Sequence, residues 1–207
     1  MKYLTEYDLI KKVQEGNTDA FEELTLKHQK TVYNISLRML KNEQDAFDVS
    51  QDALLKAYIN IKKFNGHCAF STWLYRITVN TCLDFIKKSK KDKYHISLEQ
   101  GSSADEDFPI VQVEDKKQNT ENTILEKERT DILYKAIGNL PPKHREMIIL
   151  RDLEGFSYEE ISQITNLNPG TVKSKISRAR LKLKELLSEH RELFLSFLVL
   201  FIKDMLK

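Results

Sequence analysis

Apolar residues recur at spacings of three and four along much of this chain, a pattern typical of helices that bury one face. Asp19 and Glu22 resemble a capping box at the start of the clearest run. The apolar stripe that follows consists of Phe21, Leu24, His28, Val32, Ile35 and Met39. Further helices are expected from about 45 to 61 and from after 71 to about 88. No partner ligand is near His28 in the sequence, so a core or boundary position is expected for it rather than a metal site.

Residues 94–123 lose this periodicity and collect Gly, Ser, Pro and acidic residues, which indicates a linker. The segments 94–98 and 109–113 alternate weakly, like short strands. Helical patterns return at 123–137 and 141–153, the latter with a Pro-Pro pair suited to a helix start. The predicted fold is all-α: two small helical domains joined by a flexible acidic linker. Its parts are 1–93, the linker 94–123, a domain at 124–190 and an apolar extension at 191–207.

Two helix starts lie close together in the second predicted domain. Ser157 and Glu160 have the Ser-x-x-Glu spacing of a capping box, and Asn168-Pro169 supplies an N-cap followed by a favoured first helical residue. The short connection Asn166-Leu167 between them is typical of a helix-turn-helix. From Lys173 to Lys184 the second helix carries six basic residues and no acidic one. A basic helix in this position predicts contact with DNA.

The net charge of +2 conceals an uneven distribution. Residues 1–93 carry 16 basic and 12 acidic residues, residues 94–128 carry 3 and 9, and residues 129–207 carry 14 and 10. Two basic domains therefore flank an acidic connector. Cys68 and Cys82 have neither metal-ligand spacing nor a disulfide framework, so reduced thiols are expected.

Other sequence features limit the possible location and chemistry. The N-terminus lacks the apolar core of a signal peptide, which predicts a cytoplasmic protein. No Gly-rich phosphate loop, metal-spaced His and Cys set or nucleophile pair is evident. We therefore expect no enzyme activity, no cofactor, no metal and no small-molecule substrate.

A second nucleic-acid signature lies at residues 64–91, where aromatic residues alternate with polar and basic ones. Aromatic faces stack on unpaired bases at about 1–3 kcal/mol per base, while Lys and Arg follow phosphates. The same aromatic residues are equally compatible with the core of an amphipathic helix. Spacing alone leaves both interpretations open for Trp73, Ile77 and Phe85.

The order of these features resembles the sigma factors of bacterial RNA polymerase, in the extracytoplasmic-function (ECF) group of the sigma-70 family. DAFDVSQDALLKAY (45–58) resembles the stretch that binds core polymerase. Residues 64–84, especially STWLYRITVN, resemble the stretch that melts the promoter and reads its −10 element. Residues 140–184, including LPPKHREMIILRDLEGFSYEEIS, resemble the domain that reads the −35 element. The resemblance implies that the protein directs promoter-specific initiation and captures a flipped −10 base.

The resemblance also implies a role for individual residues. For core polymerase binding they are Asp45, Asp48, Gln51, Asp52 and Leu54. For the −10 element they are Phe70, Ser71, Thr72, Trp73, Arg76, Asn80, Lys87 and Lys88. For the −35 element they are Thr171, Lys173, Ser174, Lys175, Ser177, Arg178 and Arg180. Of these, Lys173, Ser174 and Ser177 are expected at or near base edges, and Lys175, Arg178 and Arg180 on phosphates.

Several features depart from the family pattern, among them the small Ser177 at the base-reading face and the apolar tail. Asp52 stands where Glu is frequent, Leu54 where a bulky aromatic is frequent, and Lys87 and Lys88 where arginines are common. Implied partners are core RNA polymerase, promoter DNA and an anti-sigma factor, often membrane-bound. The alternative is a helix-turn-helix regulator whose N-terminal domain senses a signal or dimerises.

The segment Leu193–Ile202 is apolar but too short to cross a bilayer, which requires about twenty residues. Packing on its own domain and docking on a membrane surface or partner are both compatible with it.

Overall fold

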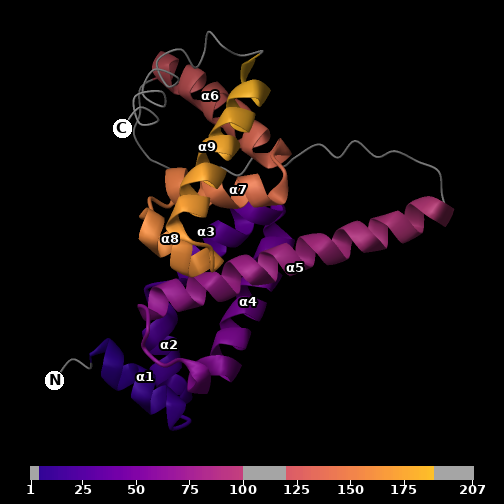
Figure 1. The fold of residues 1–207 in the computed structure, drawn as a ribbon. Coiled ribbons are helices and arrows are strands. Elements are labelled where there is room, and N and C mark those ends of the chain that lie inside the picture. The colour runs from indigo at the N-terminus through magenta and orange to yellow at the C-terminus, as the bar shows by residue number, and fades with distance from the viewer. Residues whose placement is uncertain (1–4, 100–119, 189–207) are drawn as a thin grey trace.

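The computed structural model describes residues 5–99 and 120–188, and Figure 1 shows these residues as helices and short connections. No strand occurs within these two ranges. The all-α prediction is confirmed. The weakly alternating segment 94–98 is helical, whereas 109–113 and the apolar extension lie outside the described residues.

The N-terminal module is built from helices that enclose one apolar core. Leu24, Ile35, Met39, Phe70 and Leu74 are its largest fully buried side chains. The elements are α1 (Glu6–Gln14), α2 (Thr18–Leu26), α3 (Gln29–Leu40), α4 (Glu43–Asn60), the 3-10 turn η1 (Ile61–Lys63) and α5 (Phe70–Glu99).

The first predicted helix differs from the structure in two ways. Its N-cap is Asn17, whose side-chain oxygen accepts the Ala20 N–H at 2.9 Å, and not Asp19. The apolar stripe is also divided between α2 and α3, because the chain turns at Lys27 and His28. The turn leaves the imidazole of His28 buried beside Tyr75, a contact from a distant helix that the local spacing does not reveal.

Helix α5 is longer than predicted. It begins at Phe70 and continues to Glu99, and its C-terminal half extends away from the rest of the described structure (Figure 1). The first residues assigned to the linker are therefore helical. At the other end, α6 (Thr120–Asn139) begins before the predicted Thr123, so the segment between the two helices is shorter than the sequence indicates.

The C-terminal module consists of α6, α7 (Pro142–Ile148), the π-helical turn η2 (Ile149–Leu153), α8 (Tyr158–Thr165) and α9 (Pro169–Leu186). Its core includes Leu140, Met147, Ile161, Ile164 and Ile176. The predicted helix at 141–153 is confirmed, with a change from α to π geometry in its second half.

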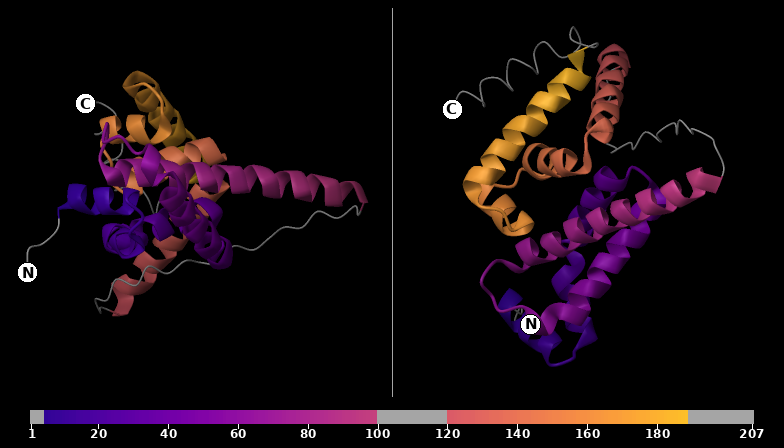
Figure 2. Two further views of the ribbon diagram at one scale, coloured as in Figure 1. Left: turned by 90° about the horizontal axis from the view of Figure 1, so that it is seen from below. Right: turned by 45° about the vertical axis from the view of Figure 1, so that its right-hand side comes forward.

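The two modules lie against each other (Figure 2). Helix α8 packs on α5, while α7 and η2 contact the C-terminal part of α3. The sequence predicted two domains on a tether but did not predict this contact.

Candidate nucleic-acid and polymerase interfaces

The helix-turn-helix has the caps that the sequence predicts. The Ser157 hydroxyl accepts the Glu160 N–H at 3.1 Å, and the Glu160 carboxylate accepts the Ser157 N–H at 2.8 Å. Asn166 ends α8 in the left-handed conformation (φ 55°), which asparagine tolerates better than most residues. The Asn168 side chain then accepts the Thr171 N–H at 2.7 Å, and Pro169 begins α9. Local sequence therefore determines where α8 ends and where α9 begins.

Helix α9 presents a polar, basic face to solvent. Lys173, Ser174, Ser177 and Arg178 are exposed, and Thr171 and Lys175 are half-buried. The opposite face, with Val172, Ile176, Ala179 and Leu183, is buried in the module. Except for Arg180, the residues predicted to reach −35 DNA lie on one accessible surface.

The position of Arg180 does not match the predicted phosphate contact. Its side chain is 8% exposed and pairs with Asp152 of η2, with Nη2 2.5 Å from Oδ1. Nε of Arg180 donates to Oδ2 of the same carboxylate at 3.3 Å. The sequence places Arg180 in a run of basic residues, but only the fold shows that it lies on the inner side of α9 and joins α9 to η2.

The residues predicted to read the −10 element divide between core and surface. Phe70 is 1% exposed and belongs to the core, which differs from its predicted DNA contact. Its ring packs against Phe64 and Trp73, with centroids 5.9 and 5.8 Å away. Thr72 and Trp73 are also buried, Ser71 and Arg76 are half-buried, and Asn80, Lys87 and Lys88 are exposed.

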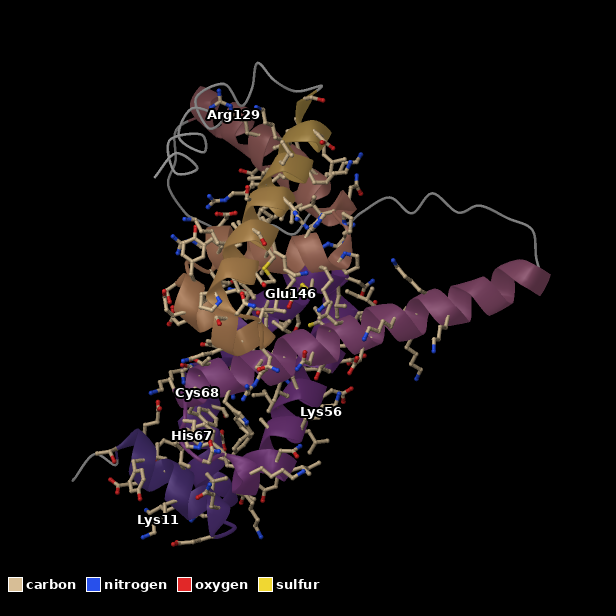
Figure 3. The ribbon with its side chains drawn as sticks, viewed as in Figure 1. Lys11, Lys56, His67, Cys68, Arg129 and Glu146 are labelled. Carbon is tan, nitrogen blue, oxygen red and sulfur yellow. The ribbon has the colours of Figure 1, made fainter. Side chains whose placement is uncertain are left out.

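A cavity of about 630 Å³ borders the loop ahead of α5. His67 and Cys68 lie on this loop, between η1 and α5 (Figure 3). Trp73 and Arg76 contribute from α5. The complete N-terminal lining is Lys63, Asn65, His67, Cys68, Trp73 and Arg76, and Ser162, Gln163, Asn166, Leu167 and Asn168 line it from α8 and the turn before α9. Basic side chains and Trp73 thus line one wall, a combination that proteins use to bind unpaired nucleotides.

A buried polar contact positions the first turns of α5. Nδ1 of His28 lies 3.0 Å from the Tyr75 hydroxyl, and their rings meet edge to face. Burial lowers the pKa of the His28 imidazole, and the nearby charge of Lys27 lowers it further. The expected core or boundary position of His28 is confirmed. A neutral imidazole here connects α3 to the helix that carries Trp73 and Arg76.

Helix α4 carries the residues predicted to bind polymerase on its exposed side. Asp48, Gln51 and Asp52 are exposed and Asp45 is half-buried, whereas Leu54 packs partly against the core. Sequence reasoning missed Phe47, Leu55 and Ile59, which are 54%, 56% and 66% exposed. The three apolar residues are spaced by eight and four positions, so they share one face of α4. That face differs from the buried stripe formed by Ala46, Val49, Ala53 and Ala57. A second apolar face on the same helix was the sequence signal that could have identified them.

The two cysteines occupy different environments. Cys68 is half-buried at the cavity, and burial raises the pKa of the Cys82 thiol to about 12. Within 5–99 and 120–188, no cluster of His, Cys, Asp and Glu is suited to hold a metal ion. In the same ranges, no helix is both long and apolar enough to span a bilayer.

The fold and these surfaces define a two-module helical protein with a capped helix-turn-helix and a cationic, aromatic cavity. Two family models match the chain: Sigma-70 region 2 at residues 24–92 and Sigma-70, region 4 at residues 130–183. The first covers α3, α4 and most of α5, and the second covers the helix-turn-helix.

Individual proteins agree with the family models. The chain is 34% identical over 181 residues to the ECF RNA polymerase sigma factor SigW of Bacillus subtilis, covering 87% of this chain and 95% of that protein. It is 37% identical over 177 residues to the ECF RNA polymerase sigma-E factor of Escherichia coli K12, covering 86% and 91%. A solved structure, the sigma factor RpoE with the anti-sigma factor NepR from Bartonella quintana, is similar with a TM-score of 0.61 and 26% identity. That match covers 81% of this chain and 96% of the RpoE chain.

The chain therefore belongs to the sigma-70 family, in its ECF group of RNA polymerase sigma factors. It binds core polymerase and directs transcription initiation at particular promoters. This assignment favours the sigma factor over a helix-turn-helix regulator.

Proposed function

We propose that the two modules divide promoter recognition between duplex and single-stranded DNA. The exposed face of α9 lies in the major groove of the −35 element, with Lys173, Ser174 and Ser177 at or near base edges and Arg178 on a phosphate. The cavity beside Trp73 receives a base extruded from the −10 element. The protein acts in the cytoplasm and performs no bond chemistry of its own.

The observation that supports base capture is the composition of the cavity wall. The buried Trp73 and the half-buried Arg76 both line the cavity from α5, and Lys63 and His67 border the same space. Extruding a base costs a few kcal/mol, and stacking on an aromatic side chain returns about 1–3 kcal/mol. The two terms are similar in size, so hydrogen bonds and phosphate contacts at the cavity mouth decide the balance without ATP.

The experiment measures promoter opening directly. Transcripts induced by overexpression identify a promoter, which is then labelled with 2-aminopurine at each −10 position and mixed with core polymerase and the protein. We expect fluorescence to rise at one position, and Arg76→Ala to reduce that rise. Lys30→Ala, an exposed cation on α3, is the matched control. If Arg76→Ala opened the promoter as fully as the wild type and Lys30→Ala, the cavity would be excluded as the capture site.

Polymerase docking is assigned to the outer face of α4, where acidic and apolar side chains are intermixed. Asp48 and Asp52 provide charge for basic groups on the polymerase, and Phe47, Leu55 and Ile59 provide apolar area. Exposed apolar patches bordered by charge are typical of protein interaction sites. We also propose an anti-sigma partner, supported by the complex of the similar RpoE chain with NepR.

A further inference from the structure

The side chain of Gln14, at the C-terminal end of α1, forms two hydrogen bonds across the N-terminal module. Its Nε2 donates to the carbonyl of Ile61 at 3.0 Å and to the carbonyl of Phe64, also at 3.0 Å. These carbonyls lie at the start of the turn η1 and directly after its end. A primary amide has two N–H donors, so one glutamine can satisfy both acceptors and fix the separation between them.

Helix α1 is itself fixed on the module and can therefore act as a support. Leu9 and Val13 are 7% and 2% exposed and pack in the core. A capping box formed by Thr5 and Asp8 stabilises the first turn of the helix. The position of the Gln14 amide therefore follows from the packing of the whole helix.

Phe64 is the residue at which η1 gives way to the loop that leads to α5. Its N–H donates to the Ile61 carbonyl at 3.0 Å, and its own carbonyl accepts from Gln14. Its ring packs against the rings of Phe70 and Trp73 at the start of α5, with centroids 5.9 and 5.3 Å away. The backbone of Phe64 is thus held from α1, and its side chain is held from α5.

The chain on either side of Phe64 supplies one wall of the cavity. The lining residues that flank it are Lys63, Asn65, His67 and Cys68. Within the loop, the Asn65 side chain accepts the His67 N–H at 3.3 Å. This bond joins near neighbours in the sequence, so it shapes the loop without fixing the position of the loop on the module. The hydrogen bonds from α1 supply that position.

We propose that Gln14 is a positioning residue for −10 recognition: through the two carbonyls it sets the place of the loop that borders the captured base. The match to the Sigma-70 region 2 model begins at residue 24, so Gln14 lies ahead of the matched span. A base-reading site loses selectivity when the groups that support it loosen. The proposal rests on the assignment of the cavity to the −10 base, whereas the effect of Gln14 on the loop does not.

Amide hydrogen exchange of the full chain tests whether Gln14 holds the loop. Gln14→Met has a similar length and no donor, and Gln14→Glu keeps the shape but replaces the donor nitrogen with oxygen. We expect both variants to speed exchange at residues 61–69 by roughly tenfold, the effect of losing one to two hydrogen bonds. Gln14→Lys restores a donor and should return exchange toward the wild-type rate. Gln29→Met, at an exposed glutamine on α3, is the matched control.

The faster exchange should be confined to residues 61–69. Equal exchange in the wild type and in both Gln14→Met and Gln14→Glu would overturn the proposal. A rise spread over α2, α3 and α4 would also overturn it, because that pattern indicates a general loss of stability.

A transcription assay tests whether the loop position controls base selection. Core polymerase and the protein are mixed with the mapped promoter, in which the captured −10 base is replaced in turn by each alternative base. We expect Gln14→Met to reduce the preference for the natural base by about threefold or more, whereas Gln14→Lys and Gln29→Met preserve it. An equal loss of transcription with every base would show a general defect and would overturn the proposal.

Failure of this proposal and failure of the capture cavity give different results. If Arg76→Ala reduces promoter opening while Gln14→Met loosens the loop without changing base preference, the cavity assignment stands and Gln14 has no part in recognition. If Arg76→Ala opens the promoter normally, the cavity assignment itself is wrong, and the exchange data alone then show whether Gln14 holds the loop.

Discussion

The guanidinium of Arg180 in α9 forms a two-bond contact with the carboxylate of Asp152 in η2, with Nη2–Oδ1 at 2.5 Å and Nε–Oδ2 at 3.3 Å. The contact fixes the DNA-facing helix to the π-helical turn before the helix-turn-helix. It also removes Arg180 from the surface where its neighbours meet solvent. Two arginines in the same helical stretch, Arg178 and Arg180, therefore have different expected roles.

Arg180→Ala should destabilise the C-terminal module, because it leaves the Asp152 carboxylate, which is only 15% exposed, without its main partner. We expect the free energy of unfolding to fall by about 3–5 kcal/mol, measured by chemical denaturation. Replacing both members, as Arg180→Met/Asp152→Leu, should recover most of this loss. Unchanged unfolding with weaker DNA binding would instead place Arg180 on a phosphate.

Arg178→Ala should leave unfolding unchanged and weaken binding to a duplex carrying the −35 element. Each lost phosphate contact lowers the slope of log affinity against log salt concentration by about 1. Titrations of the wild type and the variant at several salt concentrations give both slopes. Parallel plots would show that Arg178 makes no phosphate contact.

The Asn168 cap is expected to contribute to the stability of α9. Asn168→Ala removes the acceptor of the Thr171 N–H and should lower the free energy of unfolding by about 1 kcal/mol. Asn168→Asp keeps an acceptor at the same place and is the matched control. Thermal unfolding of the two variants should differ in midpoint, and identical midpoints would show that the cap contributes little.

Leu55→Asp should weaken binding to core polymerase, because it replaces exposed apolar surface on α4 with charge. We expect a loss of about tenfold or more in affinity, measured by fluorescence anisotropy of labelled protein with core polymerase. Leu26→Asp, at a leucine 65% exposed at the end of α2, is the control. If both variants bind equally well, the docking face lies elsewhere.

Acid should destabilise the N-terminal module through His28. Because its pKa is lowered on folding from the ordinary 6.5, the unfolded chain binds a proton more readily than the folded chain below that value. Stability therefore decreases as the pH falls below about 6.5. His28→Gln should reduce this decrease below about pH 6.5 in chemical denaturation. Parallel pH profiles for wild type and His28→Gln would contradict a neutral buried imidazole.

Local sequence signals predicted the helix-turn-helix well, since a cap depends on residues three positions apart. The Ser157 capping box, the Asn168 cap and the turn at Asn166 all appear as expected. The same reasoning located α4 but not its capping residue, Asn42. It also missed α1, which begins with a capping box at Thr5 and Asp8.

The sequence by itself determined the helical class, the order of the modules and the basic face of α9, because periodicity and capping act within a few residues. The tertiary structure alone decided which apolar and basic residues of each predicted helix face the core. Phe70 and Arg180 are buried, and Phe47 and Leu55 are exposed, because burial depends on what a distant helix covers. The ion pair between Arg38 of α3 and Glu154, which follows η2, spans more than a hundred residues, and no local pattern specifies a contact of that range.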